Sequence, residues 1–186
     1  MTRVRDAELA DTPRLLDIYR WYVERTAVTF EWKTPTPEAF RQRMEETMRR
    51  WPYLVIESDG QTLGYAYAGN FHSRASYGWC SETTIYLAPE VRRQGLGRML
   101  YTALEERLKD MGLLNLYACI GWPEQEDEYL TRDSATFHER MGYREIGRFR
   151  HCGYKFGRWY SMIWMEKIIG AHTAAPSPVR TAASLR

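Results

Sequence analysis

A short stretch, Arg92–Gly97, combines residue types that can hold a phosphate group. It reads RRQGLG and stands at the start of a run with helical spacing, so its two glycines fall at a helix start. The first backbone N–H groups of a helix have no intrahelical acceptor, and the helix dipole adds about half a positive charge there. Because glycine has no Cβ, a phosphate can approach those groups closely, and Arg92, Arg93 and Arg98 would add full charges.

The same six residues also suit an ordinary exposed helix cap, and alone they do not distinguish the two roles. Two common phosphate-binding loops are excluded, because the chain has neither the G-x-G-x-x-G pattern nor the G-x-x-x-x-G-K-[ST] pattern. The phosphate interpretation therefore depends on the elements around the motif.

Those elements form a strand, a turn and a helix. Glu82–Leu87 is a β-branched and aromatic run, and the turn that follows contains Pro89. A helix is expected from Gly95 to Met111, with Gly112 as its C-cap. Its predicted buried face consists of Leu96, Met99, Leu100, Ala103, Leu104, Leu108 and Met111. A buried strand over 113–120 would then run parallel to the one before the helix, because the connection crosses over.

The rest of the chain continues this mixed pattern. Strands are predicted over 2–6, 53–59, 62–69, 77–87, 143–154 and 159–167, and helices from Thr12, over 36–50 and over 134–141. The order predicts a mixed α/β (α+β) fold around a mostly antiparallel sheet. Residues 1–167 would make one domain, and the Ala, Pro and Ser-rich segment 168–186 a mobile or loosely docked tail.

Composition excludes several function classes. The 26 lysines and arginines exceed the 24 acidic residues by two, and the surplus lies at Arg180 and Arg186, which leaves no general basic field for nucleic acid. No uncharged run is long enough to span a membrane, and the charged N-terminus lacks the apolar core of a signal peptide, so we expect a cytoplasmic protein. Three cysteines without a C-x-x-C pair indicate packed thiols and no metal site.

Five motifs resemble those of the GNAT superfamily of N-acetyltransferases, and most closely its phosphinothricin and methionine sulfoximine N-acetyltransferase branch. They are Gly64-Tyr65-Ala66, E-x-x-x-Y-L at Glu82–Leu87, the R-x-x-G-x-G loop, Ser134-x-x-x-His138-x-x-x-Gly142-Tyr143, and Gly153-Tyr154-Lys155-x-Gly157-x-Trp159. The resemblance covers about residues 1–167. It implies a GNAT-type fold, in which a central, mostly antiparallel sheet with splayed parallel strands is flanked by helices.

The resemblance also implies acetyl-CoA as co-substrate and no metal. Backbone groups of Ile85, Tyr86 and Leu87 would pair with the pantetheine arm, and the Leu87 N–H would stabilise charge on the thioester oxygen. The pyrophosphate would lie against Arg92, Arg93, Gln94, Gly95, Leu96, Gly97 and Arg98. In this branch an asparagine precedes the serine matched by Ser134, whereas this chain has Thr131, so Ser134 or Arg132 would replace its contact with the cofactor.

Two residues match catalytic positions of the family. Glu82 would take a proton from the acceptor amine, or else be a solvated strand residue or bind the substrate ammonium without accepting its proton. His138 would supply a proton or a hydrogen bond to the leaving CoA thiolate, or else be structural. No covalent nucleophile is expected, because Cys80 and Cys119 lie on strands and lack an evident histidine partner.

The resemblance points to substrate contacts from His72, Ser73 and Arg74 in the loop before the strand, and from Thr83 and Thr84 beside Glu82. Phe30 and Trp32 either fill the core or form the wall of a substrate pocket. Arg74 either binds the carboxylate of the acceptor or is an exposed charge in a loop. Lys155 either lines the pocket or holds the last hairpin. The full set is Phe30, Trp32, His72, Ser73, Arg74, Thr83, Thr84, Tyr154 and Lys155. The acidic loop 121–133 would attract a cationic acceptor, contact a second subunit, or simply be solvated.

The expected function is acetyl transfer from acetyl-CoA to the primary amine of a small amino-acid-like acceptor, by direct attack in a ternary complex. A protein, peptide N-terminal or polyamine acetyltransferase is the alternative, and a non-catalytic acyl-CoA-binding module is a second one. A homodimer is expected from the resemblance.

Overall fold

The computed structural model describes residues 1–91 and 94–185, so the predictions for Arg92 and Arg93 lie outside the described residues. The chain divides into two compact units. Unit 1 comprises Met1–Ile18, Pro35–Leu116 and Ile168–Arg186, and unit 2 comprises Tyr19–Thr34 and Tyr117–Lys167.

Unit 1 contains four antiparallel strands in the order β1-β2-β3-β4. Their bounds are β1 Thr2–Asp6, β2 Tyr53–Ser58, β3 Gln61–Asn70 and β4 Cys80–Leu87. The turn between β2 and β3 has positive φ at both central residues, 50° at Asp59 and 80° at Gly60. This is the geometry of a type I′ hairpin, which the Asp-Gly pair favours, so the predicted hairpin is confirmed.

Unit 1 also contains most of the helices. They are the first part of α1 (Thr12–Arg25), α2 (Pro37–Met48) and α3 (Leu96–Met111), with the short 3₁₀ helices η1 (Leu9–Asp11), η2 (Ala75–Tyr77), η3 (Pro89–Val91) and η4 (Ala182–Leu185). The Thr36 side chain accepts from the Ala39 N–H at 3.2 Å and caps α2, as predicted. Gly112 ends α3 with φ of 95°, a conformation that glycine tolerates best.

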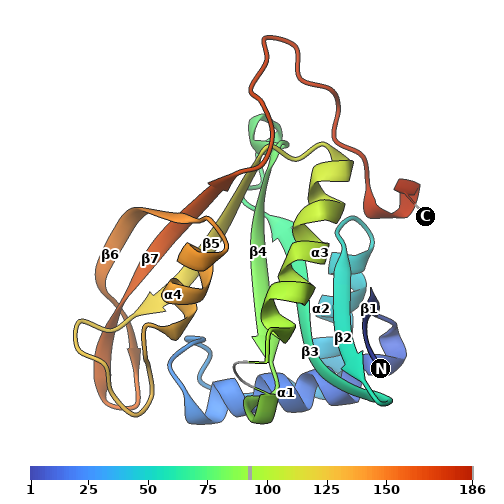
Figure 1. Cartoon of the computed structure of the whole chain (residues 1–186). Coiled ribbons are helices and arrows are strands. Elements are labelled where there is room, and N and C mark those ends of the chain that lie inside the picture. The colour runs from blue at the N-terminus through green and yellow to red at the C-terminus, as the bar shows by residue number, and fades with distance from the viewer. Residues whose placement is uncertain (92–93, 186) are drawn as a thin grey trace. The chain divides into compact units, whose positions relative to one another are not determined.

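The helices α3 and α2 cover opposite faces of the sheet in unit 1 (Figure 1). On one face, the Tyr101 hydroxyl of α3 lies 2.6 Å from the Thr83 hydroxyl of β4. On the other, Phe40 of α2 meets Tyr65 of β3 edge to face at 6.4 Å. The buried residues of α3 are Leu96, Gly97, Leu100, Tyr101, Leu104, Leu108 and Met111, whereas Met99, predicted to face inward, is 47% exposed.

On the α2 side of this sheet, three tyrosine rings stack and a fourth, Tyr86, lies tilted against them at 36°. The Tyr53 ring lies 4.8 Å from Tyr67 and 5.8 Å from Tyr65, with interplanar angles of 12° and 14°. Tyr65 in turn lies 5.5 Å from Tyr86 on β4. We call these residues the tyrosine stack. Because paired residues on neighbouring strands share a face, the stack records the register of β2, β3 and β4.

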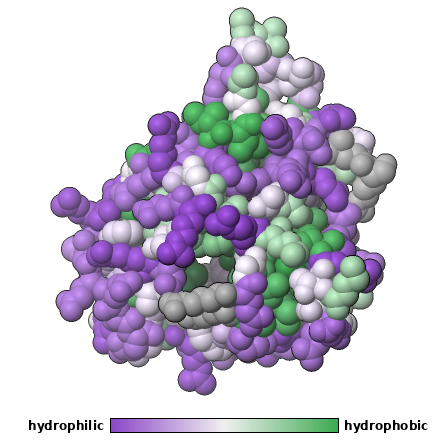
Figure 2. All heavy atoms as spheres, in the orientation of Figure 1, coloured by the Kyte–Doolittle hydropathy of each residue, from purple (hydrophilic) through white to green (hydrophobic). Residues whose placement is uncertain are grey.

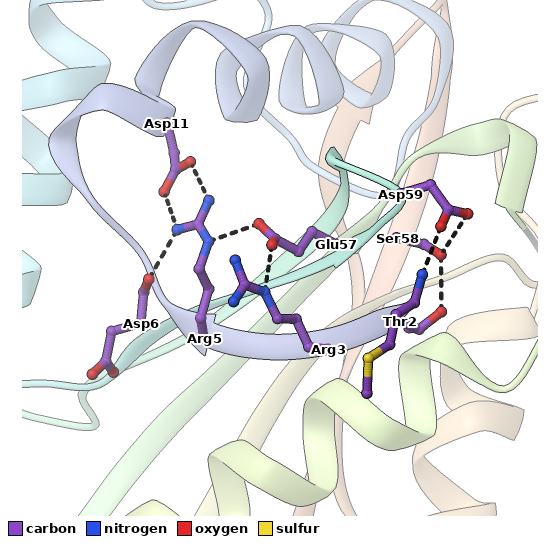
Figure 3. Close-up of polar contacts among 9 residues, drawn as sticks. Thr2, Arg3, Arg5, Asp6, Asp11, Glu57, Ser58 and Asp59 are labelled. Carbon is purple, nitrogen blue, oxygen red and sulfur yellow. Dashed lines mark hydrogen bonds and ion pairs between the residues drawn. The ribbon is translucent and has the colours of Figure 1, made fainter.

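An ion-pair network joins β1 to β2 and η1 (Figure 3). The Arg5 guanidinium donates to both Asp11 oxygens at 2.7 and 2.8 Å and to Glu57 at 2.8 Å. Arg3 donates to the other Glu57 oxygen at 2.6 Å. The hydrogen bonds from Arg5 lower the pKa of both carboxyl groups below their usual values. The network therefore fixes the first strand through paired charges at the edge of the sheet.

Unit 2 contains the rest of α1, most of β5 (Asn115–Trp122), α4 (Asp133–Arg140), β6 (Arg144–Lys155) and β7 (Arg158–Ile168), with its strands in the order β5-β7-β6. Strands β6 and β7 are antiparallel, and their turn has positive φ at Phe156 (51°) and Gly157 (76°). A small core of Ala27, Leu130 and Tyr160 packs against Phe30 and Tyr129.

The fold is thus mixed α/β, with mostly antiparallel strands flanked by helices, as the element order predicts. Among the described residues, none of the helices is long and apolar enough to cross a membrane. The face of the molecule in Figure 2 is largely hydrophilic, with hydrophobic residues in scattered groups. Within 1–91 and 94–185, no three His, Cys, Asp or Glu side chains gather as a metal site.

Candidate active site

The start of α3 has the form that the sequence predicted for a phosphate cradle. Gly95 is the N-cap, its φ is 79°, and its carbonyl accepts the Met99 N–H at 3.1 Å. A side chain at this position would meet no atom within 4 Å, so the positive φ, and not crowding, is what requires glycine. Gln94, Gly95 and Arg98 are exposed. The first turn of a 16-residue helix is therefore open to an anion.

The hydrogen-bond pattern of β4 decides which backbone groups can reach a ligand. The Ala88 N–H donates to the Leu63 carbonyl at 2.8 Å, so Ala88 and Leu63 form a hydrogen-bonded pair. Two residues earlier on β4, Tyr86 lies opposite Tyr65 and forms the next pair of this kind. In an antiparallel ladder these hydrogen-bonded pairs alternate with pairs whose N–H and C=O groups point to the other edge. Tyr86 thus bonds to β3, while the backbone groups of Ile85 and Leu87 are directed away from β3. The expected pantetheine contact from the Tyr86 backbone is therefore not supported.

Gly64 allows β3 and β4 to approach at this point. A Cβ at Gly64 would lie 2.4 Å from Leu87 Cδ2 and 2.8 Å from the Tyr86 carbonyl oxygen. No larger residue fits without moving the backbone of β4. The glycine of the Gly64-Tyr65-Ala66 motif therefore fixes the position of Leu87.

Alternation along β4 separates the residues expected to bind substrate. Glu82 and Thr84 share a face with their β3 partners Gly69 and Tyr67. Thr83 points to the opposite face, is 3% exposed, and its hydroxyl is paired with that of Tyr101. This placement contradicts the expected substrate contact from the Thr83 side chain, because a strand turns successive side chains to opposite sides.

Glu82 is a partly buried carboxyl group without a counter-ion. Burial raises its pKa above the usual value for glutamate. In the part of the chain that the structure describes, no hydrogen bond or ion pair reaches its carboxylate, and its β3 partner Gly69 leaves open space where a side chain would stand. A carboxylate in this environment is more basic than one in water, and it has room for a ligand beside it.

The loop between β3 and β4 forms a cavity of about 370 Å³. Its lining residues are His72, Ser73 and Arg74, which the sequence predicted, and Tyr77, which it missed. The Tyr77 ring lies 4.9 Å from the His72 ring. Sequence reasoning assigned Tyr77 to the next strand, whereas η2 turns it back toward Arg74, and the Tyr77 N–H donates to the Arg74 carbonyl at 3.0 Å.

In unit 2, the loop Thr26–Thr34 is held against the hairpin of β6 and β7. The Phe30 ring lies where a side chain at Gly153 would stand, 2.3 Å from its ideal Cβ. The buried Lys155 ammonium donates to the Thr29 carbonyl at 2.8 Å, and burial lowers the pKa of Lys155 to about 8. The Lys155 side chain therefore holds the loop by bonding to the backbone of Thr29. This contact favours a structural role for Lys155 over a role in lining the pocket.

The aromatic residues of this loop differ in exposure. Phe30 packs against the small core of unit 2, whereas Trp32 is 70% exposed and is not a core plug. The Trp32 ring lies 6.4 Å from that of Tyr154, which is 42% exposed and 5.1 Å from Trp159. An aromatic surface of Trp32, Tyr154 and Trp159 thus lies beside the loop.

His138 is almost completely buried, with 3% of its surface exposed. Its Nδ1 lies 2.8 Å from the Ser134 carbonyl oxygen, and because a carbonyl only accepts, Nδ1 carries the proton. Burial lowers the pKa of His138 to about 4, so the ring is neutral at physiological pH. In this tautomer Nε2 holds a lone pair and acts as an acceptor.

Three carboxylates of the acidic loop 121–133 are bonded to side chains of β7. Asp127 accepts from the Tyr160 hydroxyl and pairs with Arg158, at 2.8 and 2.9 Å, and Glu128 accepts two hydrogen bonds from Arg158. Glu124 accepts from the Ser161 hydroxyl at 2.8 Å. These carboxylates are already paired within unit 2, which disfavours the expectation that they attract a cationic acceptor.

Arg132 is engaged in the same loop. Its guanidinium donates to the Glu124 carbonyl at 2.9 Å and lies over the Trp122 ring at 4.5 Å. These contacts disfavour Arg132 as the replacement for the missing asparagine and leave Ser134, whose carbonyl orients His138.

Residues 4–164 match the family model described as an acetyltransferase (GNAT) domain. The chain is 34% identical over 177 residues to the phosphinothricin N-acetyltransferase of Streptomyces viridochromogenes, covering 95% of this chain and 92% of that protein. It is 32% identical over 176 residues to the L-methionine sulfoximine/L-methionine sulfone acetyltransferase of Pseudomonas aeruginosa, covering 93% and 98%.

Solved structures agree with these relatives. A GNAT superfamily phosphinothricin acetyltransferase from Sinorhizobium meliloti, in complex with AcCoA, superposes with a TM-score of 0.86 at 30% identity, covering 95% of this chain and 93% of that one. A ribosomal-protein-alanine N-acetyltransferase from Brucella melitensis superposes with a TM-score of 0.82 at 33% identity, covering 90% and 99%.

Proposed function

Because the chain belongs to the GNAT acetyltransferase family, we propose that its acceptor is the primary amine of a small amino acid of the phosphinothricin or methionine sulfoximine type. The chain is an acetyl-CoA-dependent N-acetyltransferase, and acetyl-CoA supplies the acetyl group as a thioester. The observation that carries the proposal is Glu82, a partly buried carboxyl group whose pKa is raised by burial and which no ion pair reaches within residues 1–91 and 94–185, on the strand that leads into the cofactor loop.

Glu82 takes a proton from the acceptor ammonium. An alkylammonium has no lone pair, so the amine must lose a proton before it attacks a carbonyl carbon. Burial makes the Glu82 carboxylate more basic and favours this transfer, directly or through one water. The neutral amine then attacks the thioester carbon directly in a ternary complex, without an acyl-enzyme intermediate.

The cavity between β3 and β4 binds the carboxylate of the acceptor. Arg74 lines it and can make two parallel hydrogen bonds to a carboxylate, while Ser73 and His72 provide further polar groups. Gly69, the β3 partner of Glu82, stands one residue before the end of β3 and so close to this loop, and one hairpin presents both groups. That combination suits an amino acid, which carries an ammonium and a carboxylate on one carbon.

The cofactor is held by backbone groups of unit 1. The first turn of α3, opened by Gly95, binds the pyrophosphate, and Ile85 and Leu87 present their backbone groups to the pantetheine arm. The Leu87 N–H stabilises the negative charge that develops on the thioester oxygen.

The neutral His138 ring can take at Nε2 the proton that the amine nitrogen still has to lose after it attacks, and can then give that proton to the departing thiolate. Because Nδ1–H is bonded to the Ser134 carbonyl, the ring must first accept a proton at Nε2. His138 thus acts as a proton carrier in this proposal and not as a standing acid.

The test is release of free CoA thiol from acetyl-CoA across a panel of amines. The panel contains phosphinothricin, methionine sulfoximine, common amino acids, polyamines, aminoglycosides and peptides with N-terminal alanine. Turnover confined to amino acids, with kcat/KM at least tenfold above that for peptides, supports the proposal. Preference for the peptides would overturn it and favour a protein as the acceptor, as in the ribosomal-protein-alanine N-acetyltransferase from Brucella melitensis.

We also propose that the protein is a homodimer, as the resemblance implied, and that it lies in the cytoplasm, as its composition indicated. Sedimentation equilibrium of the full chain tests the first point, and cell fractionation tests the second. A monomer at micromolar concentration would contradict the dimer.

A further inference from the structure

The segment Ser177–Ala182, called the strap below, runs past the end of α3 and leads into η4 (Figure 1). Its backbone makes hydrogen bonds at three separate places in unit 1. The Ser177 carbonyl accepts from the Trp79 indole N–H at 2.8 Å, the Arg180 N–H donates to the Met111 carbonyl at 2.9 Å, and the Ala182 N–H donates to the Arg50 carbonyl at 3.0 Å. A segment with little apolar surface is thus docked by hydrogen bonds.

The middle contact caps α3. The last carbonyls of a helix have no intrahelical donor and carry the negative end of the dipole. Arg180 supplies its backbone N–H to Met111 and its guanidinium to the Asp110 carbonyl, so it provides both a donor and a positive charge. The strap therefore holds the far end of the helix whose first turn forms the proposed cofactor site.

The contact between Trp79 and Ser177 fixes the end of the loop 71–79, which is proposed to bind the carboxylate of the acceptor. Trp79 directly precedes β4, and its carbonyl accepts the N–H groups of Leu114 at 2.9 Å and Asn115 at 3.3 Å. Its indole N–H bonds to the strap. Two residues earlier stands Tyr77, which lines the cavity with Arg74. Trp79 is thus tied from both its backbone and its side chain at the point where the loop joins β4.

We propose that the strap is a positioning device for acetyl transfer, with Trp79 and Arg180 as positioning residues. It sets the conformation of the loop 71–79 against the end of α3, and so the place of the acceptor carboxylate relative to Glu82. This inference rests on the proposed function, because it assigns the acceptor to that loop. Neither residue touches the substrate in this assignment.

The decisive variant is Trp79→Phe, which keeps an aromatic ring and removes the indole N–H that donates to Ser177, together with part of the ring system. We expect KM for the amine to rise about fivefold, the equivalent of one neutral hydrogen bond, with KM for acetyl-CoA and kcat changed less than about twofold. The matched control is Arg49→Met, which removes an exposed ion pair beside Arg50 and should leave both KM values unchanged.

A double-mutant cycle separates positioning from general weakening. In a chain that stops at Ala175, Trp79→Phe should have no further effect on KM for the amine, because its acceptor is already absent. An unchanged KM for the amine in Trp79→Phe, equal rises in both KM values, or additive effects in the shortened chain would each overturn the proposal.

Amide hydrogen exchange tests the role of the strap independently of whether the proposed acetyl transfer is right. If no amine is acetylated by the wild type, the proposed function fails. The strap is then tested by amide exchange of residues 72–78, which should accelerate in Trp79→Phe while β1 and β2 remain protected. Unchanged exchange in that loop would overturn the strap whatever the acceptor is.

Discussion

At the scale of single residues, the environment of Glu82 is what turns a common side chain into a base. Its carboxylate is partly buried without a counter-ion, and the charged form is therefore destabilised in the folded protein. The same unfavourable charge that raises basicity also costs stability.

Substitution of Glu82 by Gln tests both consequences. We expect kcat/KM to fall by about 10² to 10⁴, the usual contribution of general base catalysis, and the ascending limb of the pH profile to disappear. Because the folded pKa of Glu82 is raised, its charge lowers stability as pH rises through that pKa, so the variant should have a higher Tm than wild type at pH 7. Thermal scans at pH 4 and pH 7 check the sign, and a lower Tm at pH 7 would contradict the assignment of an unpartnered charge.

A second prediction for a single residue concerns Gly153. A methyl group there would overlap the Phe30 ring, so Gly153→Ala should destabilise the protein by about 1 to 3 kcal/mol through overpacking. Gly157→Ala, at a turn glycine with positive φ and open space, is the comparison, because its strain does not involve Phe30. Denaturant unfolding measures both, and rescue of Gly153→Ala by Phe30→Leu would identify the overlap as the cause.

The glycines of the R-x-x-G-x-G motif predicted Gly95 at the start of α3, and the resemblance to the family pointed to His72, Ser73 and Arg74 in the loop before β4. Neither predicted Tyr77 or the orientation of Thr83. The direction of Thr83 depends on the register of β3 and β4, which sets the face each residue occupies, and register is a long-range property.

At the scale of elements, the loop 26–34 depends on the β6–β7 hairpin for its conformation. Lys155 donates to the Thr29 carbonyl from a buried position, and Ala27 bonds through its N–H to the Tyr129 carbonyl at 2.9 Å. The loop that carries Trp32 is thus held from both sides within unit 2.

Lys155→Met should therefore loosen the loop while retaining the buried aliphatic chain. The pKa of Lys155 is lowered to about 8, so the unfolded chain binds more protons than the folded one between about pH 8 and the usual lysine value. Wild-type stability should gain a component that rises with pH across this window, and the variant should lack it. Denaturant titrations at pH 7.5 and pH 9.5 measure the difference, and an identical rise in both proteins would exclude Lys155 as its source.

Most strands and helices could be predicted to within a few residues, because their boundaries depend on local signals. Thr36 and Gly112 cap helices, and Asp59-Gly60 forms the tight turn between β2 and β3. The start of β4 was placed three residues early, since the sequence of η2 is as aromatic as that of a strand. Tyr101 was missed on the buried face of α3 because its hydroxyl pairs with that of Thr83, a partner 18 positions away in the sequence.

At the scale of the whole molecule, the N-terminal network links stability to acid pH. The pKa values of Asp11 and Glu57 are lowered by hydrogen bonds from Arg5, so these groups add stability above their unfolded pKa values and lose it as pH falls through the folded ones.

Arg5→Met should then destabilise the protein at neutral pH by about 1 to 3 kcal/mol and flatten its acid unfolding below about pH 4. The control is Arg144→Met, which removes a single pair with Glu166 from a mostly exposed side chain. Urea titrations from pH 3 to pH 7 give both quantities. Equal acid sensitivity in wild type and Arg5→Met would contradict the assigned role of the network.

The composition of the C-terminal tail, residues 168–186, does not predict how its backbone is bound. Its Ala, Pro and Ser-rich sequence predicts little burial, yet its backbone docks on carbonyl groups at the ends of α3 and α2. Those acceptors exist only after the helices have formed, and a local pattern in the tail contains no information about them.

The tyrosine stack gives unit 1 an optical signature of its own. Nearly parallel aromatic rings about 5 to 6 Å apart couple their electronic transitions, and here Tyr53, Tyr65 and Tyr67 lie within 14° of one another. Coupled transitions produce circular dichroism that vanishes as soon as the strands slip by one residue. Near-ultraviolet spectra should therefore contain a contribution that reports the register of β2 and β3 as the chain folds.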